Sequence, residues 1–167
     1  FNHRFGETFV IPKSVTPPSG ARLMDLLNPT SKMSKSGDDD TGVIYLLDDP
    51  SRIEKKFKRA VTDSETEVVF DRERKPGVSN LLEILAAATG TTPQKAAETY
   101  TRYGDLKSAS AQAVIAMLEP IQARYFELLN DQGELMRLLH KGNARAKEVA
   151  SKTLSRAQKA IGFLSAE

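Results

Sequence analysis

Apolar side chains recur at helical spacing through most of the chain after residue 49. The first such run follows Asp49–Pro50, a pair typical of a helix start, because the carboxylate caps free amides and proline is tolerated in the first turn. The apolar members lie at i, i+4, i+7 and i+8 and predict one buried helix face: Ile53, Phe57, Ala60 and Val61. The opposite face is basic, and we expect it to be exposed: Arg52, Lys55, Lys56 and Arg59.

The next two helices are predicted from their end signals. One runs from about Gly77 to Thr89, is apolar around most of its circumference, and is therefore expected at the centre of a bundle. Gly90 ends it. Thr92 then caps a third helix, which opens with a proline and ends near Gly104.

Three more helices are predicted beyond residue 104. The first begins near Asp105, and Pro120 should kink or break it, because proline lacks the amide that bonds to the preceding turn. A short helix follows and ends at Gly142. The last runs from Asn143 to about Phe163, and we expect it to bury one face: Ala146, Ala150, Leu154, Ala157 and Ile161.

The first 50 residues lack the helical spacing of apolar side chains and contain more than half of the eight prolines. Glu7–Ile11 and Val43–Leu47 are β-rich runs, Ala21–Leu27 fits a short helical turn, and Val68–Phe70 is a possible later strand. So few strands cannot form a sheet of their own. The pattern therefore predicts a mainly α chain.

Composition narrows the function classes. The 167 residues contain no cysteine and only two histidines, which excludes disulfides and thiolate sites and disfavours a histidine metal cluster. Lys and Arg number 24 against 22 acidic residues, so the chain lacks the strong cationic field of a histone-like protein. No apolar run is long enough for a membrane span, and we expect an interior or C-terminal piece of a longer cytoplasmic protein.

The strongest candidate for chemistry is the loop sequence Lys32-Met33-Ser34-Lys35-Ser36, followed by Gly37. Two ammonium groups with hydroxyls between and after them suit phosphate oxygens, and glycine lets the loop bend. A solvated charged loop is the ordinary reading of such a segment. The same five residues would arise by chance in only about one chain of this length in ten thousand.

An acidic run, Asp38-Asp39-Asp40, follows the loop. Its spacing does not match a calcium-binding loop, and the distal glutamate is missing, so we interpret it as solvated. We expect no protein ligand to a metal in this chain.

The KMSKS pentapeptide is the signature loop of class I aminoacyl-tRNA synthetases. The chain resembles the C-terminal portion of the bacterial-type tryptophanyl-tRNA synthetases over essentially its whole length. Further segments carry this resemblance: Gly20-Ala21-Arg22-Leu23-Met24, Leu46-Leu47-Asp48-Asp49-Pro50, Ala60-Val61-Thr62-Asp63, Lys75 to Leu82, and Pro120 to Tyr125. The family's adenylate motif and tryptophan pocket are not in this sequence, so the chain alone is expected to be inactive.

The resemblance implies a site and its ligands. Lys32 and Lys35 would act catalytically on the phosphates of ATP, and the residues implied in ATP binding are Leu23, Lys32, Met33, Ser34, Lys35 and Ser36. Mg²⁺ would be held by the ATP phosphates. The activity implied is ATP-dependent activation of tryptophan to its adenylate, followed by transfer to tRNA(Trp).

The resemblance also implies an architecture. It is a helical, anticodon-binding-type C-terminal domain attached to the tail of a Rossmann-type catalytic domain. Residues 1–50 would belong to the catalytic domain and residues 51–130 to the anticodon-binding-type domain. Residues 131–167 would form C-terminal helices, the last of them packing back on the catalytic domain. The full-length protein would be a homodimer without membrane contact.

A basic stripe on the last predicted helix is the candidate tRNA contact: Arg145, Lys152, Arg156 and Lys159. Spacings of seven, four and three place these side chains on one face. A solvated face and a contact with RNA phosphates both fit this pattern. Two other functions also remain open, a tyrosyl-type synthetase fragment and a non-catalytic RNA-binding helical module.

Overall fold

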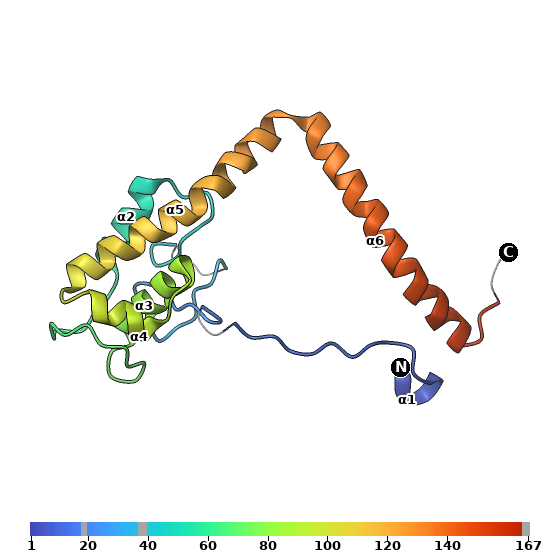
Figure 1. The fold of residues 1–167 in the computed structure, drawn as a ribbon, viewed down its shortest axis with the longest axis horizontal. Coiled ribbons are helices and arrows are strands. Elements are labelled where there is room, and N and C mark those ends of the chain that lie inside the picture. Colours follow the sequence, from blue (N-terminus) through green and yellow to red (C-terminus); the bar gives the residue numbers. More distant parts are fainter. Residues whose placement is uncertain (18–19, 37–39, 165–167) are drawn as a thin grey trace. The chain divides into compact units, whose positions relative to one another are not determined.

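Six helices follow one another in the computed structural model, which describes residues 1–17, 20–36 and 40–164 (Figure 1). They are α1 (Asn2–Phe5), α2 (Pro50–Arg59), α3 (Pro76–Thr89), α4 (Pro93–Thr99), α5 (Tyr103–Asn130) and α6 (Gln132–Ala160). The described residues contain no strand, and their only β pairing is one isolated antiparallel bridge, Met24 with Lys32. The prediction of a mainly α chain is confirmed. None of the described helices is long and apolar enough to cross a membrane.

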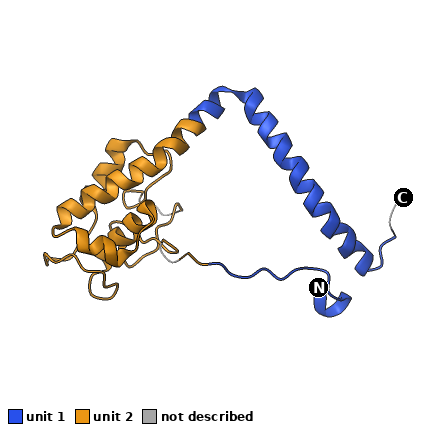
Figure 2. Cartoon of the chain, in the orientation of Figure 1, with its two compact units in different colours: residues 1–15, 125–167 blue, residues 16–124 orange. Residues whose placement is uncertain are grey.

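The chain forms two compact units (Figure 2): residues 16–124, and residues 1–15 with 125–167. The hydrophobic core lies in residues 16–124, orange in Figure 2, where α2, α3, α4 and the first part of α5 meet. Its fully buried large side chains are Phe57, Leu26, Ile53, Leu81, Leu82, Leu106 and Val78.

Helix α3 is the centre of this core, as its sequence predicts. Ten of its fourteen residues are buried. Proline occupies its first turn, and Gly90 ends it with a left-handed backbone, φ 70°, while its amide donates to the carbonyl of Ala86. The helix is therefore defined at both ends by residues suited to those positions.

Helix α2 begins as predicted but differs on its polar face. The Asp49 carboxylate accepts the Arg52 amide at 3.0 Å, and Ile53 and Phe57 are buried. The expectation that Lys56 is exposed is wrong, since only 6% of its surface is accessible, whereas Val61, expected in the core, is 45% exposed. Lys56 is buried because a carboxylate from the preceding loop pairs with it, as described below.

The predicted strands do not form. Glu7–Ile11, Val43–Leu47 and Val68–Phe70 are irregular. A strand is stable only when a neighbour takes its backbone groups, and no described segment pairs with any of the three. Within the first, Val10 and Ile11 are 88% and 79% exposed.

The predicted helical turn at Ala21–Leu27 is also wrong. The backbone groups that a helix would need are bonded elsewhere. The Asp25 amide donates to the Ser31 carbonyl at 2.9 Å, and the Leu26 amide donates to the Gly42 carbonyl at 2.9 Å. Residues 21–27 therefore form an irregular segment whose backbone is hydrogen-bonded to residues 31 and 42.

The later helices are longer than predicted. Pro120 lies inside α5 without ending it, and Gly142 lies inside α6, so the two helices expected on either side of Gly142 are one. Helix α4 ends at Thr99 rather than near Gly104. Proline weakens a helix by removing one hydrogen bond, and glycine weakens it by adding backbone freedom. The helical residues on both sides of Pro120 and of Gly142 outweigh these effects here.

The apolar face expected to be buried on α6 is open. Of its five residues only Ala157 is buried, and Leu154 is 58% exposed. Ala146, Ala150 and Ile161 are likewise exposed. In the other segment of this unit, Phe1 packs against Phe5 and Phe9, with ring centroids 5.0 and 4.8 Å apart.

Core packing generates the first prediction. Phe57 is 1% exposed, so Phe57→Ala should lower the free energy of unfolding by about 3–5 kcal/mol, through lost transfer energy and the cavity that remains. Urea unfolding followed by circular dichroism measures this. The control is Phe126→Ala, whose ring is 52% exposed and whose loss should change stability far less. Equal effects would show that Phe57 is not part of the core.

Candidate functional site

The loop of residues 32–36 begins where the isolated β bridge fastens it. The Met33 amide donates to the Leu23 carbonyl at 3.0 Å, and the Asp25 amide donates to the Ser31 carbonyl at 2.9 Å. These two bonds flank the Met24–Lys32 pair. The backbone at the first lysine is therefore held by the upstream segment.

The structure separates the predicted site residues into two groups. Leu23 and Met33 are partly buried and pack against the hydrophobic core. The four polar residues are exposed: Lys32, Ser34, Lys35 and Ser36. The apolar side chains thus face inward while both ammonium groups remain accessible to an anion.

A cavity of ≈ 320 Å³ opens beside the start of the loop. Lys32 and Ser34 line it together with Asp25 and Gly42. The Asp25 carboxylate is engaged, because its Oδ1 accepts the amides of Leu27 and Asn28 at 2.8 and 2.9 Å. The Lys35 and Ser36 side chains do not line this cavity. The Gly37 and Asp38-Asp39 positions lie outside the described residues.

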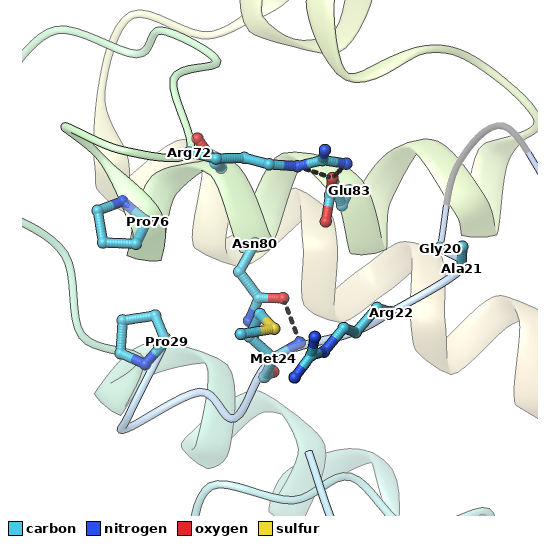
Figure 3. A pocket seen from close by; sticks show the side chains of 10 residues that line it. Gly20, Ala21, Arg22, Met24, Pro29, Arg72, Pro76, Asn80 and Glu83 are labelled. Carbon is cyan, nitrogen blue, oxygen red and sulfur yellow. Dashed lines mark hydrogen bonds and ion pairs between the residues drawn. The ribbon is translucent and has the colours of Figure 1, made fainter. Parts of the chain in front are cut away.

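The segment before the loop is anchored to α3 by Asn80. Its side-chain oxygen accepts the Met24 amide at 2.9 Å, and its side-chain nitrogen donates to the Met24 carbonyl at 2.8 Å. Figure 3 shows this pair in a cavity of ≈ 370 Å³, with Arg22 beside it and the Arg72–Glu83 ion pair on the opposite wall. Asn80 itself is 3% exposed.

The segment after the loop is held by a buried ion pair. Lys56 Nζ lies 2.7 Å from Asp48 Oδ2 and donates to the Val43 carbonyl at 2.6 Å. Asp48 also accepts the Tyr45 amide at 3.0 Å. A carboxylate and an ammonium that are both buried require such partners, so residues 43–48 are fixed on α2.

Two further contacts join the flanks of the loop. Arg52 bonds Asp40 at 2.7 Å and lies 3.3 Å from Asp48. Gly42 packs so closely on Asp25 that an added Cβ would lie 2.0 Å from Oδ1 of that carboxylate. Glycine fits this approach without displacing the Asp25 carboxylate from the two amides that it accepts.

Sequence reasoning did not find Asn80, Asp48, Lys56 or Gly42 as parts of this arrangement. Asn80 had a signal, since it is one of the few polar residues in a helix that is apolar around most of its circumference. The sequence carried no such signal for Lys56, because its position in the helix belongs to the basic face that was expected to be exposed. Its burial depends on a carboxylate in a loop eight residues earlier.

A second polar network lies on the connection between α2 and α3. Lys75 Nζ contacts Glu65 at 2.6 Å, the Tyr103 hydroxyl at 3.0 Å and Asp63 Oδ1 at 3.2 Å. The Tyr103 hydroxyl donates to Asp63 Oδ1 at 2.7 Å. Asp63 Oδ2 is buried without a hydrogen-bond partner among the described residues.

The charges of this network determine its ionisation. Hydrogen bonds from Lys75 to Glu65 and Tyr103 hold the pKa of Lys75 well above its usual range. Burial raises the pKa of Asp63, but hydrogen bonds from Tyr103, the Glu65 amide and Lys75 outweigh burial and leave that pKa below its usual value. Asp63 therefore stabilises the fold as the anion.

The candidate tRNA stripe lies on α6, with Arg145, Lys152, Arg156 and Lys159 all exposed. Lys152 pairs with Glu148 at 3.1 Å, and Arg156 donates to the Thr153 hydroxyl at 3.4 Å. These contacts are local to the helix and weak at an exposed surface. All four cations remain accessible to a phosphate backbone.

The comparisons with known proteins identify the class. The family described as tRNA synthetases class I (W and Y) matches residues 1–119, so the chain belongs to that family. Among its relatives, it is 48% identical to tryptophan–tRNA ligase 1 of Streptomyces avermitilis over 99% of this chain and 50% of the relative. It is also 48% identical to the tryptophan–tRNA ligase of Oceanobacillus iheyensis, over 98% and 50%.

A solved structure also resembles this chain in its fold. The tryptophanyl-tRNA synthetase of Mycoplasma pneumoniae superposes with a TM-score of 0.87 at 30% identity, over 98% of this chain and 50% of that chain. All three of these proteins are named for tryptophan, which supports the tryptophanyl resemblance over the tyrosyl alternative. The chain spans about half the length of the curated relatives it matches.

The Asp63 network generates a prediction about pH. Because the folded pKa of Asp63 is below the unfolded value, its ionisation stabilises the fold above the unfolded pKa, and this stability is lost as the pH falls through the folded pKa. Tyr103→Phe removes the hydrogen bond that the hydroxyl donates to Asp63 and should raise the folded pKa of that carboxyl. The variant should be less stable at about pH 7 and should lose less of its remaining stability between about pH 7 and pH 3.

Urea midpoints at the two pH values measure this effect. Tyr125→Phe is the control, because that ring is 43% exposed and its removal of a hydroxyl should leave the pH dependence unchanged. An unaltered acid slope in Tyr103→Phe would mean that the hydroxyl does not set the ionisation of Asp63.

Proposed function

We propose that this chain supplies the ATP- and pyrophosphate-binding loop, and a tRNA-docking surface, of a tryptophan–tRNA ligase. The observation that carries the proposal is the loop of residues 32–36. Its two flanks are fastened to the core, and Lys32 and Lys35 are exposed upon it. The names of the relatives supply the amino acid and the tRNA.

The residues present fit a polyphosphate. During activation the tryptophan carboxylate attacks the α-phosphorus of ATP, and negative charge moves onto the departing pyrophosphate. Lys32 and Lys35 would hold that charge, and the hydroxyls of Ser34 and Ser36 would donate to the same oxygens. Leu23 and Met33 are only partly buried, and by the resemblance Met33 would pack near the adenine while Leu23 would lie beside it. Mg²⁺ would travel with the ATP phosphates and needs no ligand from this chain.

The arrangement of domains belongs to the same proposal. Residues 1–50 would complete a Rossmann-type catalytic domain, residues 51–130 would form the anticodon-binding-type domain, and the last helix of residues 131–167 would pack back on the catalytic domain. The open apolar face of α6 suits such packing. The complete ligase would act in the cytoplasm as a homodimer.

The stripe on α6 is the proposed tRNA contact. Four exposed cations along one helix face suit a run of phosphates, which are recognised by charge rather than by sequence. The stripe carries no interleaved aromatic side chains, so it would hold the backbone and leave the reading of bases to other residues.

The proposal predicts the kinetic effect of Lys35→Ala in the complete ligase. Adenylate formation at saturating ATP and tryptophan should slow by about 10²–10³-fold, because one preorganised charge is lost from the transition state. Lys32→Ala should behave similarly. Pre-steady-state adenylate formation against ATP concentration is the measurement. Lys55→Ala, an exposed lysine on α2, is the matched control. A change confined to the apparent ATP affinity would make the loop a ground-state binding element instead.

The stripe predicts a change in salt dependence. Replacing Lys152 and Arg156 with Gln should lower the log–log slope of tRNA binding against salt by about two units, since each phosphate contact contributes about 0.9. The control replaces Arg4 and Lys13, which are exposed in the other segment of the same unit. If both double variants keep the parent slope, the stripe is a solvated face.

A further inference from the structure

Asn80 is a buried amide in the middle of an apolar helix, and both ends of that amide contact one residue. It is 3% exposed and contacts the backbone of Met24, which lies 56 positions earlier in the chain, through one accepted and one donated bond. Burying an amide is unfavourable unless its polar atoms are bonded. Leucine would fill the same position in the core without that demand. The clamp on Met24 therefore gives the amide a purpose beyond packing.

The bridge explains why Met24 needs this partner. In an antiparallel pair, the two bonds that flank a non-hydrogen-bonded pair come from the neighbouring residues. Here Leu23 and Asp25 make those bonds to Met33 and Ser31. The amide and carbonyl of Met24 itself therefore point away from the loop, and Asn80 bonds both. Figure 3 marks the bond from the Met24 amide to the Asn80 side-chain oxygen.

The opposite side of Met24 faces the first lysine of the loop. Residues in a non-hydrogen-bonded pair have the shortest Cα separation and adjacent side chains, so the position of Met24 determines that of Lys32. Upstream, Gly20 lies so close to α3 that an added Cβ would lie 2.9 Å from the Ala87 Cβ. Residues 20 and 24 thus both contact α3, and Asn80 makes the hydrogen bonds at the second of these positions.

We propose that Asn80 is a positioning residue for the activation of tryptophan by ATP, acting through Met24 on Lys32. The inference rests on the proposed function of the loop. A charge stabilises a transition state most when it is already in place, and displacements of about 1 Å can slow a reaction about 100-fold. Asn80 holds the backbone from which Lys32 projects. Arg22, Arg72 and Glu83 line the same cavity without contacting Met24 in this way.

The test is a double-mutant cycle in the complete ligase, with adenylate formation as the readout. Asn80→Leu removes both hydrogen bonds while keeping the number and branching of the side-chain heavy atoms, and it should slow the reaction by about 10–100-fold. Lys32→Ala should slow it by about 10²–10³-fold. In the Lys32→Ala background, Asn80→Leu should slow it by less than about threefold more, because the group that it positions is gone.

Folding is controlled separately. Rates are normalised to the folded fraction from thermal melting, and Asn80→Ser, a smaller polar residue that cannot bridge both groups, repeats the cycle if Asn80→Leu does not fold. Asn130→Leu, at the exposed end of α5, is the matched control and should leave the rate unchanged. If Asn80→Leu acted by destabilising the fold in general, its effect on the rate would multiply with that of Lys32→Ala. It would not vanish in the double variant.

The outcomes separate the two proposals. If Lys32→Ala does not slow activation, the proposed function of the loop is wrong. If Lys32→Ala slows activation but the effect of Asn80→Leu multiplies with it, or is absent in both backgrounds, the loop keeps its function and the positioning role of Asn80 is rejected.

Discussion

A helix that is apolar on nearly all sides is stable in water only when other segments cover it, and α3 places this constraint on residues 16–124. Covering it brings α2, α4, the start of α5 and the irregular segment around Leu26 together. The same burial forces the few polar side chains of α3 to find partners, because an unbonded buried amide is unfavourable. The hydrogen bonds of Asn80 to Met24 follow directly from that requirement.

The loop of residues 32–36 combines a fixed base with accessible charges. Upstream it is held by the Met24–Lys32 bridge, and downstream by Asp48 and Lys56, a buried pair that salt screens less than an exposed one. Its ammonium groups project from this base into solvent. A phosphate site needs both properties, since fixed charges lose less entropy on binding and exposed charges can be reached.

The sequence predicted well the helix ends that a capping side chain or a left-handed glycine defines, whereas the helix end at Gly142 and the helical turn at Ala21–Leu27 were wrong. The caps at Asp49 and Thr92, the end of α3 at Gly90, and the central place of α3 are confirmed, because each follows from local chemistry or a 3.6-residue period. The predicted strands and the predicted exposure of Lys56 were wrong, since both depend on partners outside the predicted segment itself. The motif located the loop, but no periodic pattern could show which side chain of α3 bonds the segment before it.

The contact between Asn80 and Met24 has a further consequence for association. A side-chain amide presents the same donor and acceptor as a peptide group, so Asn80 occupies the edge of the Met24–Lys32 pair as an adjacent strand would. Open edges of this kind recruit extended segments from other molecules and promote aggregation. With its outer groups already bonded inside the core, this short pair offers no template for strand addition at Met24.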